Sequence, residues 1–197
     1  MRNKFKLALL SLACISTVAT SGCALSPQII ELQTGSPIME AQEVNGRSAL
    51  VRVRDLRKVS DRLGHRGGSQ PENALLLAKP SLQQALTVKM QNSLQSFGFG
   101  GNSPFEPIKV DLAIEQFEYR CNSGAWVSQC QLEMELNLTI TEEGDTFSQP
   151  FKLKQERSVA TAPRVGYNEE WINQAIDKVW LHMLTSPQVK RALGINL

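Results

Sequence analysis

The chain has 197 residues, of which 42% are hydrophobic and 20% are charged, a composition typical of one globular domain with a real core. Arg2, Lys4 and Lys6 are three of its 21 basic residues, so 18 basic and 19 acidic residues remain after this basic start. That nearly neutral balance excludes a generally basic protein that binds nucleic acid.

The first 23 residues have the pattern of an exported bacterial lipoprotein. The basic start is followed by an uncharged run, 7–18, that is too short to cross a membrane as a helix. The run leads to Thr20-Ser21-Gly22-Cys23, which resembles the bacterial lipobox. We therefore expect residues 1–22 to be a signal peptide and Cys23 to carry the lipid. The alternative is an ordinary signal peptide, cut nearby, that leaves Cys23 as a thiol.

Two regions follow the leader. Residues 23–48 contain scattered prolines and glycines and little periodicity, which favours a lipidated N-terminus and tether. The 25 residues that follow Cys23 in this tether would reach about 80 Å when fully extended. Within it, residues 29–32 could add an edge strand to the sheet. Residues 49–197 are expected to form a single domain.

The first half of this domain predicts two strands and a helix. Residues 49–53 alternate between apolar and charged positions, as in a half-buried strand, and 74–78 form a second short strand. Between them, 54–73 has no apolar period and is expected to be a long loop. Residues 81–97 have one apolar face and begin with a capping pair, Ser81 and Gln84.

The second half predicts three antiparallel strands and a helix. The strands are 108–119, with a bulge near Gln116, then 131–141 and 147–155. Asn168 is expected to cap a helix with a wide apolar stripe, and Pro187 to begin a last short helix. The order predicts a two-layer α+β fold, with a mainly antiparallel sheet of four to six strands and two amphipathic helices on one face.

Two of the four cysteines are left for a disulfide in the mature chain. Cys14 lies within the leader and Cys23 is the expected lipid site, which leaves Cys121 and Cys130 in a compartment that permits disulfides. In a hairpin centred on 122–129 the two residues would stand opposite each other, within disulfide reach. The alternative is a pair of buried free thiols.

Catalytic and metal-binding patterns are not present in the sequence. The two histidines, His65 and His182, are far apart, and no nucleophile motif, phosphate loop or zinc-ligand spacing accompanies them. We therefore expect no enzyme activity, no metal and no cofactor.

The segment 54–68 is the one local concentration of positive charge. We expect Asp55 and Arg57 to form an internal pair, and Arg62 and Arg66 to face an anionic ligand or a partner protein. The candidate binding surface comprises Arg54, Arg57, Arg62, Arg66 and Trp126. The alternatives are a solvated loop whose arginines pair with its aspartates and, for Trp126 at the hairpin tip, packing over the sheet edge rather than anchoring a partner.

Several motifs resemble those of the YajG family of uncharacterised bacterial lipoproteins. They are the lipobox at Cys23, the run Val51-Arg52-Val53-Arg54-Asp55-Leu56-Arg57, the run Leu63-Gly64-His65-Arg66, the helix end Phe97-Gly98-Phe99 and the strand 108–119. The resemblance covers nearly the whole mature chain. It implies an envelope lipoprotein with a compact α+β domain and no agreed molecular activity.

These observations lead to a functional expectation. Ala24, rather than an aspartate, follows the lipid cysteine, which in such proteins implies sorting to the outer membrane. We expect a lipoprotein anchored to the outer membrane through Cys23 and facing the periplasm, acting as a non-enzymatic binding or accessory domain. The alternative is a structural component or assembly factor of a larger envelope complex.

Overall fold

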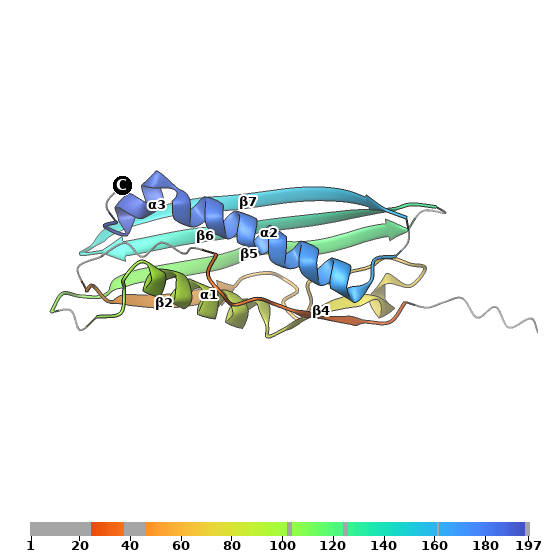
Figure 1. Ribbon diagram of the computed structural model, residues 1–197, viewed down its shortest axis with the longest axis horizontal. Coiled ribbons are helices and arrows are strands. Elements are labelled where there is room, and N and C mark those ends of the chain that lie inside the picture. The colour runs from red at the N-terminus through yellow and green to blue at the C-terminus, as the bar shows by residue number, and fades with distance from the viewer. Residues whose placement is uncertain (1–24, 38–45, 102–103, 124–125, 161, 196–197) are drawn as a thin grey trace, which may run out of the picture.

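The computed structural model describes residues 25–37, 46–101, 104–123, 126–160 and 162–195. In these residues three α-helices lie over a mixed, seven-stranded sheet (Figure 1). The strands are β1 (Gln28–Glu31), β2 (Ala49–Asp55), β3 (Gly64–His65), β4 (Leu75–Lys79), β5 (Ile108–Ser123), β6 (Ser128–Glu142) and β7 (Asp145–Val159). The helices are α1 (Leu82–Ser96), α2 (Val165–Thr185), α3 (Pro187–Ala192) and the short 3-10 helix η1 (Pro71–Asn73).

The α+β class and the predominance of antiparallel pairing are confirmed, but the expected strand count is wrong. The described residues form seven strands rather than four to six, while α1, α2 and the short α3 are the two amphipathic helices and the last short helix that the sequence predicts. The extra strand arises from a segment without an alternating pattern. This strand is β3, two residues long, which lies within the stretch expected to be an irregular loop.

The long strand β5 is the centre of the sheet. On one side it pairs antiparallel with β6, which pairs antiparallel with β7. On its other side β2 and β3 follow one another, both parallel to β5: β2 pairs with residues 108–114, and β3 pairs with Tyr119 and Arg120. Beyond β3 lie β4 and then β1. Residues 115–118 of β5 therefore face a gap between two strands, which the loop 56–63 fills.

The alternation of apolar and polar residues determines the faces of β5 and β6. In β6 every second residue, from Leu132 to Ile140, is buried against the helices. In β5 the register shifts between Ile114 and Gln116, which confirms the expected bulge. Before the bulge the even-numbered residues, such as Ile114, face the core, and after it the odd-numbered residues Phe117 and Tyr119 do so.

The segment expected to be a tether is partly folded into the sheet. The strand β1 pairs parallel with β4, and its Ile30 is fully buried. Its outer edge is closed by α2: the Glu31 N–H donates to Glu169 Oε2 at 2.9 Å, and the Gln33 N–H donates to Asn173 Oδ1 at 2.8 Å. The edge strand that the sequence allowed at 29–32 is therefore present as β1, one edge of the sheet.

The helices divide the covering of the sheet. α1 begins at the expected cap, where Ser81 Oγ accepts from the Gln84 N–H, and it lies on β2 and β4. α2 contacts β1 and β7, so the cover differs from the expected two helices on one face, because each helix lies over its own strands of the sheet. The two helices meet where Trp180 Nε1 donates to Ser93 Oγ at 2.8 Å. Trp171 and Trp180 are both fully buried, as expected for core residues.

The start of α2 differs from the expectation at Asn168. The helix begins at Val165, one turn earlier, after the extended residue Arg164. Asn168 is fully buried and uses its side chain for tertiary contacts: Oδ1 accepts from the Tyr119 hydroxyl at 2.6 Å, and Nδ2 donates to Gln28 Oε1 at 2.7 Å. Asn168 thus joins β5, α2 and β1 instead of capping the helix.

The sheet face away from the helices is polar and internally paired. Arg52 pairs with Asp111 across β2 and β5, and Lys152 Nζ lies 2.8 Å from Glu135 Oε1 across β6 and β7.

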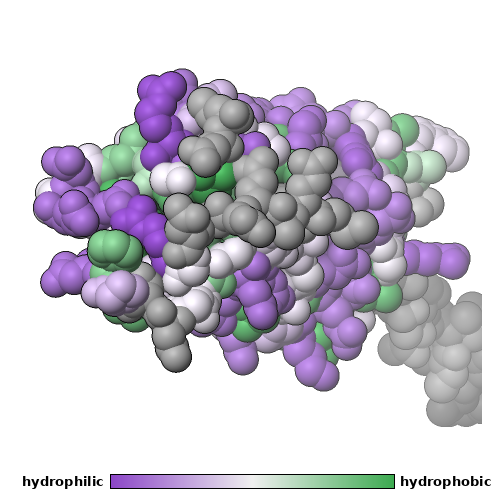
Figure 2. Space-filling model, turned by 60° about the vertical axis from the view of Figure 1, so that its left-hand side comes forward, coloured by the Kyte–Doolittle hydropathy of each residue, from purple (hydrophilic) through white to green (hydrophobic). Residues whose placement is uncertain are grey.

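Figure 2 shows the surface from the side of α3, where hydrophilic residues surround separate hydrophobic ones. In the described part of the chain, no helix is long and apolar enough to cross a membrane.

Candidate functional site

A buried ion pair closes the end of β2. Arg57 Nη2 donates to Asp55 Oδ2 at 2.7 Å, and the two side chains are 5% and 7% exposed. The same guanidinium donates to the carbonyl oxygens of Ser60, Arg62 and Phe117. Phe117 lies in the part of β5 that faces the gap, so Arg57 supplies a hydrogen bond that a neighbouring strand would otherwise supply. The expected internal pair is confirmed, and it fixes the loop to the sheet.

Leu63 and Gly64 bring the loop back against β5. The Leu63 N–H donates to the Leu76 carbonyl at 2.7 Å, and its carbonyl accepts from the Tyr119 N–H at 2.8 Å. Gly64 has a φ of +146°, and a Cβ at this position would lie 1.8 Å from the Tyr119 carbonyl oxygen. Only glycine fits this close approach of two backbones.

Arg66 points into the protein, so the expectation that it faces a ligand is wrong. It is 7% exposed, and its Nη1 and Nη2 donate to the carbonyl oxygens of Pro163 and Ser26. Its Nε has no hydrogen-bond partner among the described residues. Burial lowers the pKa of the Arg66 guanidinium. Arg66 joins the chain before β1 to the chain before α2, a structural role.

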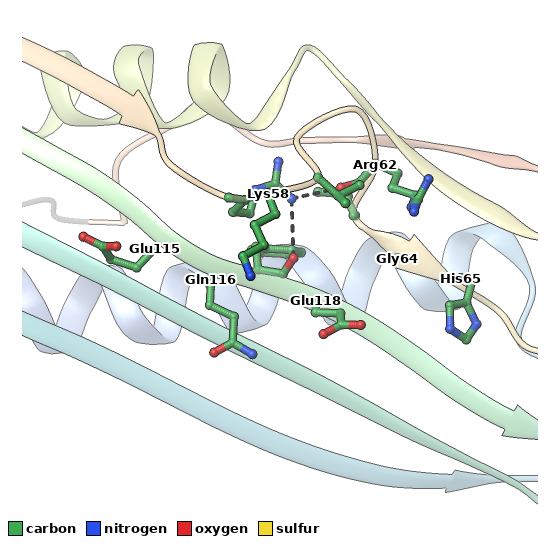
Figure 3. Close-up of a pocket in the computed structure, with 11 residues that line it drawn as sticks. Lys58, Arg62, Gly64, His65, Glu115, Gln116 and Glu118 are labelled. Carbon is green, nitrogen blue, oxygen red and sulfur yellow. Dashed lines mark hydrogen bonds between the residues drawn. The ribbon is translucent and has the colours of Figure 1, made fainter. Parts of the chain in front are cut away.

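The loop 56–63 and the bulge of β5 enclose a surface hollow of about 350 Å³ (Figure 3). From the loop side it is lined by Lys58, Val59, Arg62 and His65, and from β5 by Glu115, Gln116 and Glu118. In Figure 3 the carboxylates of Glu115 and Glu118 extend from the strand beneath the loop that carries Lys58 and Arg62. The hollow exists because no strand fills the sheet between β2 and β3.

The charges around the hollow are of both signs and are open to solvent. The Arg62 side chain is 41% exposed, with its Nη1 3.8 Å from Asp61 Oδ1. Glu118 is 44% exposed, with its Oε1 3.6 Å from Arg120 Nε. Partial burial lowers the pKa of His65, and its Nδ1 accepts from the Gly67 N–H at 3.3 Å. The lowered pKa favours the neutral form of His65, and Lys58 and Arg62 carry the positive charge on the loop side.

The structure separates the residues expected to form one binding surface. Arg62 lines the hollow, Arg57 and Arg66 are buried, and Arg54 is exposed on β2. Lys58 and His65 belong to the basic segment that the sequence singled out, but sequence reasoning missed Glu115 and Glu118 as lining residues, because nothing in the chain pattern shows that the bulge lies beside the loop.

Trp126 lies at the far tip of the hairpin between β5 and β6, where it is 86% exposed. Of the two expectations for this residue, exposure is the one observed. The strands pair as far as Ser123 and Ser128, and Cys121 and Cys130 stand opposite each other in a disulfide. The expected disulfide is therefore confirmed, and it joins the strands two residues before Ser123 and two residues after Ser128, at the base of the tip.

The described residues contain no cluster of three or more histidine, cysteine, aspartate or glutamate side chains placed to hold a metal ion. His182 packs its ring edge-on against Phe151, with centroids 5.7 Å apart. The expected lipid site, Cys23, lies outside the described residues.

Solved structures similar to this chain are distant in sequence. A Xanthomonas campestris protein of the DUF330 family is 11% identical, with a TM-score of 0.49, and the match covers 86% of this chain and 98% of that one. A second, described as an uncharacterized protein, is 14% identical with a TM-score of 0.38 and coverage of 88% and 99%. A third, a putative neuraminyllactose-binding hemagglutinin homolog from Helicobacter pylori, is 13% identical with a TM-score of 0.37 and coverage of 81% and 97%.

The search of curated proteins found no match. A family model, in contrast, covers most of the fold. The model is Lipoprotein_16, described as "Uncharacterized lipoprotein", and it matches residues 36–194. The match begins after β1 and ends two residues beyond α3. The motifs that hold the loop to β5, from Asp55 to Arg66, lie inside this match. The chain therefore belongs to this family of uncharacterised lipoproteins, the YajG family that its sequence motifs resemble.

Proposed function

We propose that this protein is anchored by lipid on Cys23 to the outer membrane, faces the periplasm, and acts by binding rather than by catalysis. Membership of a lipoprotein family supports the anchor, and the lipobox supplies its position. Ala24 behind the cysteine supports the outer membrane as its destination.

The hollow beside the β5 bulge is the observation that carries the binding proposal. It has a fixed floor, because the buried Asp55–Arg57 pair and the Gly64 contact hold the loop to the sheet. On the loop side its rim presents exposed cations, Lys58 and Arg62, and the apolar side chain of Val59, which is 43% exposed, while the carboxylates of Glu115 and Glu118 lie on the strand side. A rigid floor with a polar and apolar rim suits a partner that presents a carboxylate or phosphate group.

The anchor is tested by Cys23→Ser. Without the thiol no thioether to a diacylglycerol can form, so the variant is expected to accumulate as an unprocessed precursor. Intact mass and membrane fractionation of the exported protein measure this. Cleavage and release of the variant at the wild-type rate would contradict the lipoprotein assignment of Cys23.

The binding surface is tested with a photo-reactive amino acid at Val59 in intact cells. With no other substitution, the protein is expected to crosslink to one discrete partner. The double substitution Lys58→Ser and Arg62→Ser is expected to abolish this crosslink. The matched control removes two exposed cations elsewhere, with Arg54→Ser and Lys109→Ser, and should leave the crosslink unchanged. All variants are expected to unfold at nearly the same temperature, because solvent-exposed substitutions change stability by roughly 0.5 kcal/mol or less.

Equal crosslinking in both double variants would remove the hollow as the binding site. In solution, capture of the identified partner by the wild-type protein is also expected to weaken as salt is raised, since exposed charge pairs are screened. Capture that is independent of salt would show that Lys58 and Arg62 do not supply the contact.

A further inference from the structure

One end of the molecule combines the start of the described chain with its most exposed aromatic side chain. The register of four strands establishes this: Gln28 pairs with Leu76, Leu76 with Gly64, and Gly64 with Tyr119. β1 runs antiparallel to β5, so the residues before Gln28 lead to the same end as the residues after Tyr119. In Figure 1 the red start of β1 and the arrowhead of β5 share the right-hand end.

The chain is held at this end as far back as Leu25. Leu25 Cδ1 would lie 3.2 Å from a Cβ on Gly68, and the Ser26 carbonyl accepts a hydrogen bond from Arg66. Two peptide units join Cys23 to Leu25, and two residues span at most about 7 Å. A lipid on Cys23 would therefore hold this end of the protein against the bilayer surface.

The same end exposes apolar side chains that a membrane surface would cover. Trp126 is 86% exposed and Val127 is 43% exposed at the hairpin tip, and Val165 is 46% exposed at the start of α2. The beginning of α2 belongs to this end because Pro163 accepts hydrogen bonds from Arg66 and from Gln28. The exposed charges at this end include Arg120 and Arg164 together with Glu72 and Glu156, two of each sign, so a generally anionic surface is not required.

We infer that the tip of the β5–β6 hairpin is a membrane-contact site, with Trp126 inserted among the phospholipid headgroups of the leaflet that holds the acyl chains. Tryptophan is suited to this position, since its ring is largely apolar and its N–H prefers a wet partner. The Cys121–Cys130 disulfide holds the tip in place. This inference rests on the proposed lipidation of Cys23, which places the tip at the bilayer.

The experiment uses the full lipoprotein, purified from membranes and reconstituted in phosphatidylethanolamine–phosphatidylglycerol vesicles. Some vesicles contain phospholipids brominated near the headgroup end of the acyl chains, which quench tryptophan in contact with them. Trp171 and Trp180 are fully buried, so the difference between wild type and Trp126→Phe reports Trp126 alone. The fluorescence emission of Trp126 is expected to be largely lost in brominated vesicles and to be protected from quenching by aqueous iodide.

A matched control places the tryptophan at the opposite end. Phe105, 63% exposed and just before β5, is replaced in Phe105→Trp with Trp126→Phe. Its added emission should be quenched by iodide and not by brominated lipid. Quenching of Trp126 by iodide and not by bromine would overturn the inference.

The mass of the N-terminal residue of the same preparation separates the two proposals. If Cys23 is acylated but Trp126 is quenched by iodide, the proposed anchor stands and the membrane-contact site is rejected. An unmodified Cys23 contradicts the anchor itself, whatever the fluorescence shows.

Discussion

At Gly64 the carbonyl oxygen of Tyr119 occupies the space that a Cβ would need. The glycine of the Leu-Gly-His-Arg run is thus required by a strand more than fifty residues further along the chain. The other motif residues have comparable structural roles: Leu63 is 1% exposed, Asp55 and Arg57 pair in the interior, and Arg66 is buried between two carbonyl groups. These motif residues hold the loop to the sheet and thereby shape the hollow.

Gly64→Ala is expected to lower the free energy of unfolding by about 3 kcal/mol, from backbone strain and from separation of β3 and β5. The matched control is Gly144→Ala. Gly144 also has a positive φ, +96°, but has nothing within 4 Å of an added Cβ, so only conformational strain of about 1 kcal/mol applies. Urea unfolding of both variants measures the difference, and equal losses would show that the Tyr119 contact costs nothing.

At the scale of the element, β1 is the strand whose importance the sequence understates. It has four residues and lies within a stretch containing prolines and glycines, so the sequence alone suggested at most an edge strand within a tether. Its stability comes from partners distant in the chain. Ile30 enters the core, and side chains of α2 satisfy the outer backbone groups of Glu31 and Gln33.

Ile30→Ala is expected to destabilise the protein by about 3 kcal/mol, the usual loss for a buried isoleucine truncated to alanine. The adjacent Ile29 is 57% exposed, so Ile29→Ala is expected to change stability by less than about 0.5 kcal/mol. Thermal or urea unfolding of the two variants makes the comparison. No loss in Ile30→Ala would mean that β1 contributes no stability to the sheet.

Across the whole molecule, the elements with local signals were predicted well and those that depend on distant partners were not. The alternation of β6, the Ser81 cap and the facing cysteines are all readable within about fifteen residues of sequence. Asn168 resembles a cap locally, but its partner Tyr119 is 49 residues away. No local pattern could show that β2 ends where β5 bulges.

The candidate site illustrates the same limit. Arg62 could be selected from the sequence because basic residues cluster around it, whereas Glu115 and Glu118 belong to a strand and carry no local signal. Arg66 was misassigned because its partners, Ser26 and Pro163, are 40 and 97 residues from it in sequence. A charged cluster in the chain becomes a surface only after the fold has used some of its members internally.

The contacts of Leu25 and Ser26 bear on the stage at which the proposed lipidation of Cys23 would take place. In the folded domain the chain is fixed against Gly68 and Arg66 only two residues after Cys23. An enzyme that acts at Cys23 would therefore find the chain that follows already packed against the folded domain. On the proposed lipidation of Cys23, we expect attachment of the lipid and removal of the leader to precede the docking of β1 at the sheet edge.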